Sequence, residues 1–178
     1  MPRTRTSSRR PASRISAFSF TLLLGIGGLN SIGGTAPAAT ATATARRLQP
    51  PAASVATTVV ELTNQARASA GLAPVIEDSH LTAAANAHSS DQAAARTMSH
   101  TGTDGSNPGA RMTAAGYTWW TWGENVAAGQ KTAALVVDAW MNSPGHRANI
   151  LNGSFTSIGV GSVASVDGIL YWTMDLAA

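Results

Sequence analysis

The chain of 178 residues contains no cysteine. This absence excludes disulfide bridges, cysteine-type zinc sites, thiolate nucleophiles and a lipid anchor attached through cysteine. The fold must therefore be held together by its core, and a hydrophobic share of 44% is enough for one globular domain. Any metal ion would have to be bound by histidine and carboxylate side chains.

The sequence also lacks the compact motifs that mark common enzyme and ligand sites. There is no HExxH zinc motif, no GxSxG nucleophile elbow, no phosphate-binding P-loop, no GxGxxG fingerprint and no EF-hand loop. A basic stripe interleaved with aromatic residues is missing as well, so we expect no nucleic-acid partner. What remains is a set of separated polar residues, which must be judged by their positions along the chain.

Residues 1–45 are typical of a secretory signal peptide followed by its cleavage zone. Five arginines without an acidic residue precede the apolar run Ile15–Ile32, and small residues then offer Ala-x-Ala cleavage sites between Ala38 and Ala45. We therefore predict a secreted protein, extracellular or periplasmic according to the cell envelope, with no transmembrane segment after signal removal. Cleavage would leave seven basic and nine acidic residues, so the pI of 10.2 describes only the precursor.

The remaining residues predict a short flexible arm, 46–54, and one folded domain, 55–178. Apolar residues recur at helical spacing in three stretches, a proline suits the start of a fourth helix, and the last third is rich in β-formers and glycine. We expect a turn at Val166-Asp167-Gly168 inside a hairpin. The fold class is therefore α/β, with helices on both faces of a small antiparallel sheet. The expected helices are 55–70, 81–98, 108–115 and 133–142.

Three polar residues next to predicted turns could carry chemistry: His100, Glu124 and His146. Two imidazoles and a carboxylate are the usual protein ligands of an open zinc site, and the same set could serve as an acid and base pair. Each residue also has a structural interpretation, because histidines can cap loops and a carboxylate can accept backbone N–H bonds in a turn. His88 faces an apolar helix stripe, so we interpret it as a core histidine.

Three tryptophans, Trp119, Trp120 and Trp122, form an aromatic cluster. Large aromatic side chains are most often part of a core, which is the interpretation we favour here. The alternative is that they line a ligand cleft.

A series of short segments, taken in order, resembles bacterial members of the CAP superfamily, which includes cysteine-rich secretory proteins, antigen 5 and plant pathogenesis-related proteins. Each segment alone has little specificity, whereas the ordered series covers about residues 55–176 and is very specific. The segments are Asn64-Gln65-Ala66-Arg67, Gly71-Leu72-Ala73-Pro74-Val75, Ser99-His100, Gly123-Glu124-Asn125-Val126-Ala127, Ala139 through Leu151, Ile158-Gly159-Val160-Gly161 and Tyr171-Trp172-Thr173.

The resemblance implies an α-β-α sandwich with a central antiparallel sheet and a cleft lined by two histidines and two acids. By position, His100 and His146 match the two histidines, and Glu124 matches the acid of the Gly-Glu-Asn segment. Ser143 stands where eukaryotic relatives carry the remaining acid. This departure weakens any mechanism that needs two carboxylates, but it does not remove metal binding.

Three functions follow as hypotheses. The first is an extracellular binding module, expected to be monomeric, for a small molecule, lipid, glycan or peptide, with a His/Glu/His cleft able to hold Zn²⁺ or another divalent metal. The second is a metal-dependent, protease-like hydrolase that uses His100 and His146 as ligands and Glu124 as the catalytic base. The third is a structural envelope protein with a degenerate site. The sequence leaves open whether the protein is an enzyme.

Overall fold

A computed structural model describes residues 54–178. The predicted leader, 1–45, and all but the last residue of the predicted arm, 46–54, lie outside the described residues. The described elements, in chain order, are α1 (Val55–Ser69), β1 (Ile76–Glu77), α2 (Ser79–Ala95), α3 (Pro108–Ala114), β2 (Trp122–Ala128), α4 (Ala133–Met141), α5 (Pro144–Ile150), β3 (Ser157–Ala164) and β4 (Leu170–Ala177).

The four strands form one sheet in the order β1-β3-β4-β2. β4 pairs antiparallel with both β2 and β3, and the two-residue strand β1 pairs parallel with β3. The predicted hairpin is confirmed as β3 and β4, and Gly168 in its turn has a φ of +80° that suits glycine. The sheet is therefore antiparallel, as predicted, except at its β1 edge. β2 forms the opposite edge.

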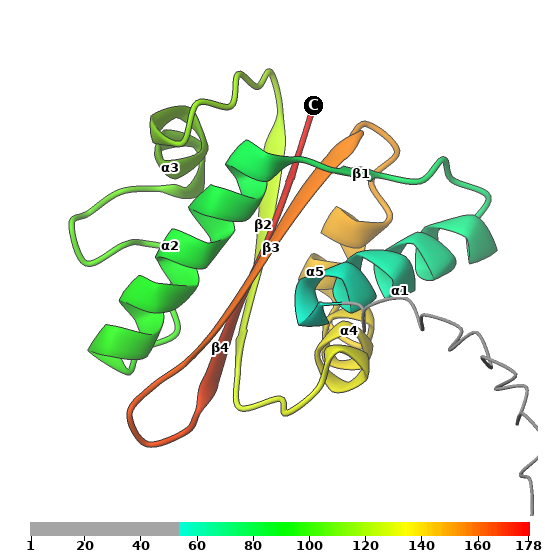
Figure 1. Ribbon diagram of the computed structural model, residues 1–178. Coiled ribbons are helices and arrows are strands. Elements are labelled where there is room, and N and C mark those ends of the chain that lie inside the picture. Colours follow the sequence, from blue (N-terminus) through cyan, green and yellow to red (C-terminus); the bar gives the residue numbers. More distant parts are fainter. Residues whose placement is uncertain (1–53) are drawn as a thin grey trace, which may run out of the picture. The chain divides into compact units, whose positions relative to one another are not determined.

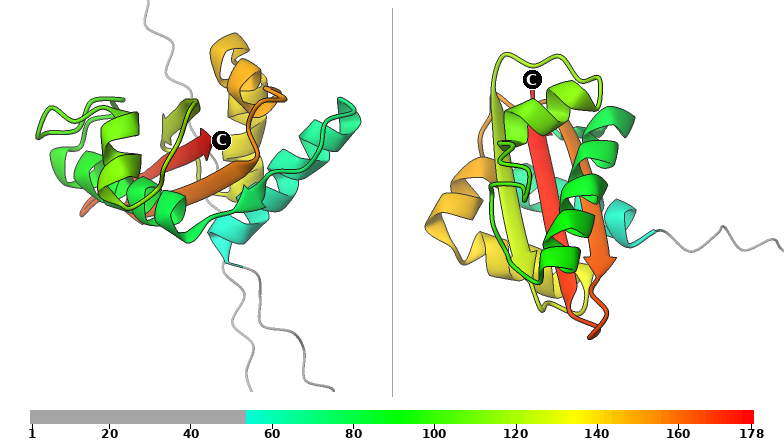
Figure 2. Two further views of the ribbon diagram at one scale, coloured as in Figure 1. Left: turned by 90° about the horizontal axis from the view of Figure 1, so that it is seen from above. Right: turned by 90° about the vertical axis from the view of Figure 1, so that its left-hand side faces the viewer.

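Helices cover both faces of this sheet, which confirms the predicted sandwich (Figure 1). α2 and α3 lie on one face, and α1, α4 and α5 lie on the other, as both views of Figure 2 show. The larger apolar core fills the space between the sheet and the second group of helices. It includes Val59, Val136, Trp140, Ile158, Val160, Trp172, Met174 and Leu176.

α2 lies directly against the backbone of β3 because two glycines leave room for it. A Cβ atom on Gly159 would lie 2.1 Å from the carbonyl carbon of Leu81, and one on Gly161 would lie 2.4 Å from that of Ala85. Such distances are far shorter than any contact between real atoms. The Ile158-Gly159-Val160-Gly161 segment therefore sets how closely α2 approaches the sheet.

Arg67, near the end of α1, holds the chain between α5 and β3. Its guanidinium is buried and donates hydrogen bonds to the carbonyl oxygens of Ala73, Ile150, Asn152 and Phe155. One side chain thereby satisfies four backbone acceptors, one at the C-terminal end of α5 and three in segments without regular structure. This explains why an arginine stands in the Asn64-Gln65-Ala66-Arg67 segment.

Two expectations about local structure are wrong. Glu124 was expected beside a turn, but it lies inside β2, whose residues are nearly all buried. The tryptophan cluster was expected in the core, but Trp119 is 37% and Trp120 is 71% exposed, and only Trp122 packs partly buried against the smaller core on the α2 side. The buried tryptophans of the core are instead Trp140 and Trp172.

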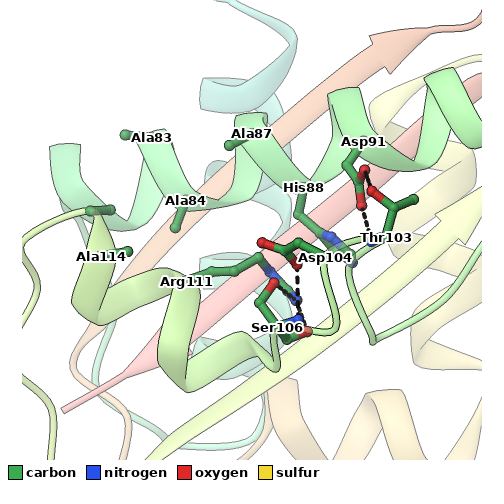
Figure 3. A pocket seen from close by; sticks show the side chains of 11 residues that line it. Ala83, Ala84, Ala87, His88, Asp91, Thr103, Asp104, Ser106, Arg111 and Ala114 are labelled. Atoms are coloured by element: carbon green, nitrogen blue, oxygen red, sulfur yellow. Dashed lines mark hydrogen bonds between the residues drawn. The ribbon is translucent and has the colours of Figure 1, made fainter.

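The face that carries α2 and α3 also carries a groove of about 490 Å³ (Figure 3). Its walls are α2, α3 and the loop of residues 99–107 that joins them. Within residues 54–178, no helix combines the length and the apolar character needed to cross a membrane.

Candidate functional site

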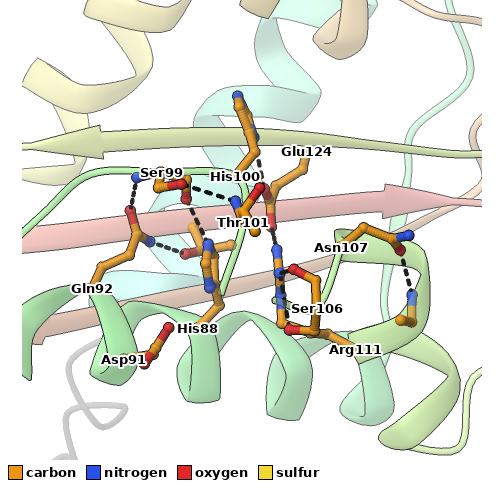
Figure 4. A network of polar contacts seen from close by, with 12 residues as sticks. His88, Asp91, Gln92, Ser99, His100, Thr101, Ser106, Asn107, Arg111 and Glu124 are labelled. Atoms are coloured by element: carbon orange, nitrogen blue, oxygen red, sulfur yellow. Dashed lines mark hydrogen bonds and ion pairs between the residues drawn. The ribbon is translucent and has the colours of Figure 1, made fainter. Parts of the chain in front are cut away.

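Glu124 is the centre of a buried charge network at the edge of the sheet. Its side chain is only 1% exposed, and each carboxylate oxygen has its own partner. Oε1 lies 2.7 Å from Nδ1 of His100, and Oε2 lies 2.5 Å from Nη2 of Arg111 (Figure 4). His100 and Glu124, which the family resemblance placed in one cleft, are thus in direct contact.

The loop that carries His100 is held in place by α2. The Ser99 carbonyl accepts a hydrogen bond from Nε2 of the buried His88 at 2.7 Å, and the Ser99 N–H donates to the Gln92 side chain. Gln92 in turn donates to Thr173 on β4. The interpretation of His88 as a core histidine is thus confirmed, and it has an indirect role in placing the neighbouring His100.

Glu124 fixes both the tautomer and the charge preference of His100. Because a carboxylate only accepts hydrogen bonds, Nδ1 carries the proton and Nε2 is the nitrogen left to meet a ligand. The hydrogen bond to Glu124 raises the pKa of His100, while partial burial opposes this increase. The His100 side chain is 55% exposed, so its free nitrogen lies at the surface.

His146 reaches the same edge of the sheet from the opposite face. It lies on α5, whose position is fixed because Asn125 of β2 donates to the His146 carbonyl oxygen and Asn149 donates to the Glu124 carbonyl oxygen. Burial and, next, the charge of His100 lower the pKa of His146. His146 therefore favours the neutral form that binds metals.

Ser143 does not replace the acid that relatives carry at its position. It is the residue before the first turn of α5, and its side chain makes no capping hydrogen bond. The second histidine therefore has no carboxylate at this place to orient it.

A second carboxyl group, Asp175, is instead present beside Glu124, and sequence reasoning missed it. Asp175 lies directly opposite Glu124 in the pairing of β2 with β4 and is 0% exposed. Neither of its oxygens has a hydrogen-bond donor among residues 54–178. Burial, followed by the nearby charge of Glu124, raises the pKa of Asp175 well above its ordinary value. Burial therefore favours the protonated, neutral form of Asp175.

Arg111 is the other residue that sequence reasoning missed. It reaches Glu124 from α3, and its Nη1 donates to the Ser106 carbonyl oxygen at 2.9 Å. Nothing in the sequence links Arg111 to Glu124, since only the packing of α3 on the sheet brings them together. Asp175 did leave a signal, because it is a charged residue in a predicted strand of otherwise apolar and aromatic neighbours.

The site offers a metal ion two imidazoles rather than a full protein cage. Among residues 54–178, no three histidine, aspartate or glutamate side chains are grouped as metal ligands. Glu124 already accepts hydrogen bonds from His100 and Arg111, so it would support the His100 imidazole and would not itself bind the metal ion. A carboxylate on Nδ1 is the usual arrangement that orients a metal-binding histidine. Nε2 of His100 and the imidazole of His146 are therefore the groups that could hold an ion, with solvent completing the shell.

Comparison with known proteins gives one family. The sequence model of the cysteine-rich secretory protein family, abbreviated CAP, matches residues 60–176. The uncharacterized protein YkwD of Bacillus subtilis is 48% identical over 107 residues, which are 60% of this chain and 42% of that protein. The chain thus spans less than half the length of this curated relative.

Solved structures agree on the fold. An extracellular protein containing an SCP domain from Bacillus anthracis has a TM-score of 0.63 and 28% identity, over 69% of this chain and 40% of that chain. An outer surface protein from Borrelia burgdorferi has a TM-score of 0.62 and 24% identity, over 67% of this chain and 88% of that chain. The second likeness concerns the fold alone.

Proposed function

The chain belongs to the cysteine-rich secretory protein (CAP) family, and from this premise we propose that it is an extracellular binding module that holds a divalent cation, such as Zn²⁺, between His100 and His146. The observation that carries the proposal is the 2.7 Å contact between His100 Nδ1 and the buried Glu124 carboxylate. This contact presents Nε2 of the imidazole outward in a fixed orientation.

Two observations support a place outside the cell. The basic and apolar leader of residues 1–45 has the composition of a signal peptide. The structurally similar protein from Bacillus anthracis, which is 28% identical, is described as extracellular.

The electrostatics of the site favour a neutral His146 and an oriented His100. Burial keeps His146 from taking up a proton, so its imidazole is available as a ligand at neutral pH. The raised pKa of His100 means that a proton competes with the metal there, and binding should weaken as the pH falls. A bound divalent ion would supply Lewis acidity and an acidified water at the surface of the sheet edge.

Binding is favoured over hydrolysis because Glu124 is poorly placed to act as a general base. Its side chain is buried and its two oxygens are paired with His100 and Arg111, which keeps it away from solvent water and lowers its tendency to accept a proton. Its geometry suits a positioning role for His100. The second carboxyl, Asp175, is buried beside Glu124 on the neighbouring strand and reaches neither imidazole through a hydrogen bond in the described residues.

Zinc titration by calorimetry tests the proposal on the full chain at pH 7.5. We expect one-to-one binding that is lost in the His100→Ala/His146→Ala double variant. His80→Ala is the matched control, because His80 is exposed and lies at the start of α2. Glu124→Gln should weaken binding by about 10- to 100-fold, as expected when a carboxylate behind a metal-binding histidine is lost.

Each outcome separates the three functions considered. Equal affinity of the wild type and the double variant would refute the metal site, and no binding in either would favour a structural envelope protein. Metal-dependent cleavage of a casein or peptide-ester panel by the wild type, lost in Glu124→Gln, would instead support the hydrolase hypothesis. Binding without cleavage supports the module proposed here.

A further inference from the structure

The groove between α2 and α3 is built differently from the histidine site. One end is walled by methyl groups of Ala83, Ala84 and Ala87 on α2 and of Ala114 on α3. The other end gathers polar side chains from α2 and from the loop of residues 99–107 (Figure 3). Its volume of about 490 Å³ lies within the range of sites for small molecules. The groove is thus amphipathic along its length.

The polar end presents hydrogen-bond acceptors. Asp91 accepts from the backbone N–H and the hydroxyl of Thr103, and Oδ1 of Asp104 accepts from the Ser106 N–H. These bonds lower the pKa of both aspartates, so both carboxylates are ionised at neutral pH. Oδ2 of Asp104 accepts no bond from the described residues and is free to bind a donor.

A buried acceptor without a partner lines the same groove. His88 is 1% exposed, and its Nε2 donates to the Ser99 carbonyl oxygen, which leaves Nδ1 as an acceptor. Nδ1 is buried and has no hydrogen-bond partner among residues 54–178. Burial lowers the pKa of His88, so the imidazole is neutral and can accept a proton donor. An unpaired buried acceptor is costly, and a ligand N–H would satisfy it.

The charge of the one cationic side chain that lines the groove is already balanced by a partner outside the groove. Arg111 borders the groove, but its guanidinium is bound to the Glu124 carboxylate and to the Ser106 carbonyl oxygen. The two aspartates therefore leave the polar end with a negative charge that the groove itself does not balance. Negative charge and acceptors at one end, with apolar walls at the other, match a ligand with a cationic head and a short hydrocarbon body.

We propose that this groove binds a small amphipathic amine, its ammonium group on Asp104 and His88 and its hydrocarbon chain against the alanine walls. An ammonium group has three donors and no acceptor, which complements this set of acceptors. The site lies on the α2 side of the sheet and involves neither of the histidines proposed to bind metal. It is therefore a second binding site, with contact residues other than the two histidines of the function proposed above.

NMR titration of the full ¹⁵N-labelled chain tests this inference with three probes of similar size: hexylammonium, hexanol and hexanoate. Hexylammonium should bind saturably and shift signals of Ala84, Ala87 and Thr103. Hexanol should bind at least about tenfold more weakly, because it lacks the charge-assisted hydrogen bonds. Hexanoate should not bind measurably, because its carboxylate meets Asp91 and Asp104.

Two variants and one control locate the site. Asp104→Asn removes the charge but keeps an oxygen for the Ser106 N–H, and it should weaken hexylammonium binding by about tenfold. Ala87→Leu should abolish binding by filling the groove, provided that circular dichroism shows an unchanged fold. Asp138→Asn removes an equal charge from an exposed position on α4, across the sheet, and should leave the affinity unchanged.

Either of two results would overturn the inference. The first is hexylammonium binding that is absent at millimolar concentrations or that is equalled by hexanol. The second is an Asp104→Asn variant that binds as tightly as the wild type, since this variant keeps the loop geometry and tests the charge alone.

Discussion

Replacing Glu124 with glutamine should reduce the free energy of unfolding by about 3 kcal/mol at pH 7. The side chains of Glu124 and Arg111 are 1% and 10% exposed, so their ion pair is buried, and loss of one partner from such a pair typically costs about 3–5 kcal/mol. His100 adds little, because a partner that is 55% exposed is screened by solvent. We expect the lower end of this range of about 3–5 kcal/mol, because the carboxyl group of a neighbouring acid can replace part of the negative charge lost from Glu124.

That neighbouring acid is Asp175. The charge of Glu124 helps to keep Asp175 protonated, so the pKa of Asp175 should fall in Glu124→Gln and its carboxylate can then balance Arg111. Asp175→Asn should therefore stabilise the wild type and destabilise the Glu124→Gln variant. The effect of Asp175→Asn on the free energy of unfolding should thus change sign between the wild-type and Glu124→Gln backgrounds, which a double-mutant cycle measures. Few purely structural roles of Asp175 would produce this change of sign.

Urea denaturation followed by tryptophan fluorescence measures these differences. Glu61→Gln is the control, because Glu61 is an exposed acid on α1, and its replacement should cost less than about 0.5 kcal/mol. The imidazole pKa of His100, followed by NMR, should fall in Glu124→Gln because the hydrogen bond that raises it is lost. A cost below about 1 kcal/mol for Glu124→Gln, or the same sign for Asp175→Asn in both backgrounds, would refute the reasoning.

Two further predictions concern stability. Between pH 3.8 and the higher pKa of folded Asp175, the folded state holds a proton that the unfolded state has lost, so the wild type becomes less stable as the pH rises. The stability advantage of Asp175→Asn should therefore grow across this pH range and be absent below pH 3.8. Urea midpoints measured from pH 3 to 9 check this trend. Gly159→Ala should cost at least about 3 kcal/mol, because the new methyl group would collide with the Leu81 backbone 2.1 Å away, whereas Gly145→Ala, with open space around it, should be nearly neutral. Thermal unfolding of both variants tests the contrast.

Much of the fold could be predicted because it depends on local patterns. Apolar spacing placed α1, α4 and the β3–β4 hairpin close to their observed bounds, and the zero cysteine count correctly implied a domain held by its core. The ordered motifs predicted the α-β-α sandwich, because they resemble a family whose fold is known. β2 was missed because Gly123-Glu124-Asn125 has polar residues that are buried on both faces of the sheet, where alternation of polar and apolar residues fails.

The candidate site was predictable only in part. His100 and Glu124 were paired through the family resemblance, and the structure shows their contact directly. Exposure of Trp119 and Trp120 was not predictable, because aromatic content alone does not tell a surface loop from a core.

The sequence by itself determined the class of fold, the absence of disulfides, the signal-like leader and the identity of His100, Glu124 and His146 as candidates. Only the tertiary structure decided that Arg111 neutralises Glu124, that Asp175 lies buried beside it with a raised pKa, and that a groove with a negative end opens between α2 and α3. The reason is physical. Local propensities act over a few residues, whereas burial and charge pairing depend on segments that meet only after the helices pack on the sheet.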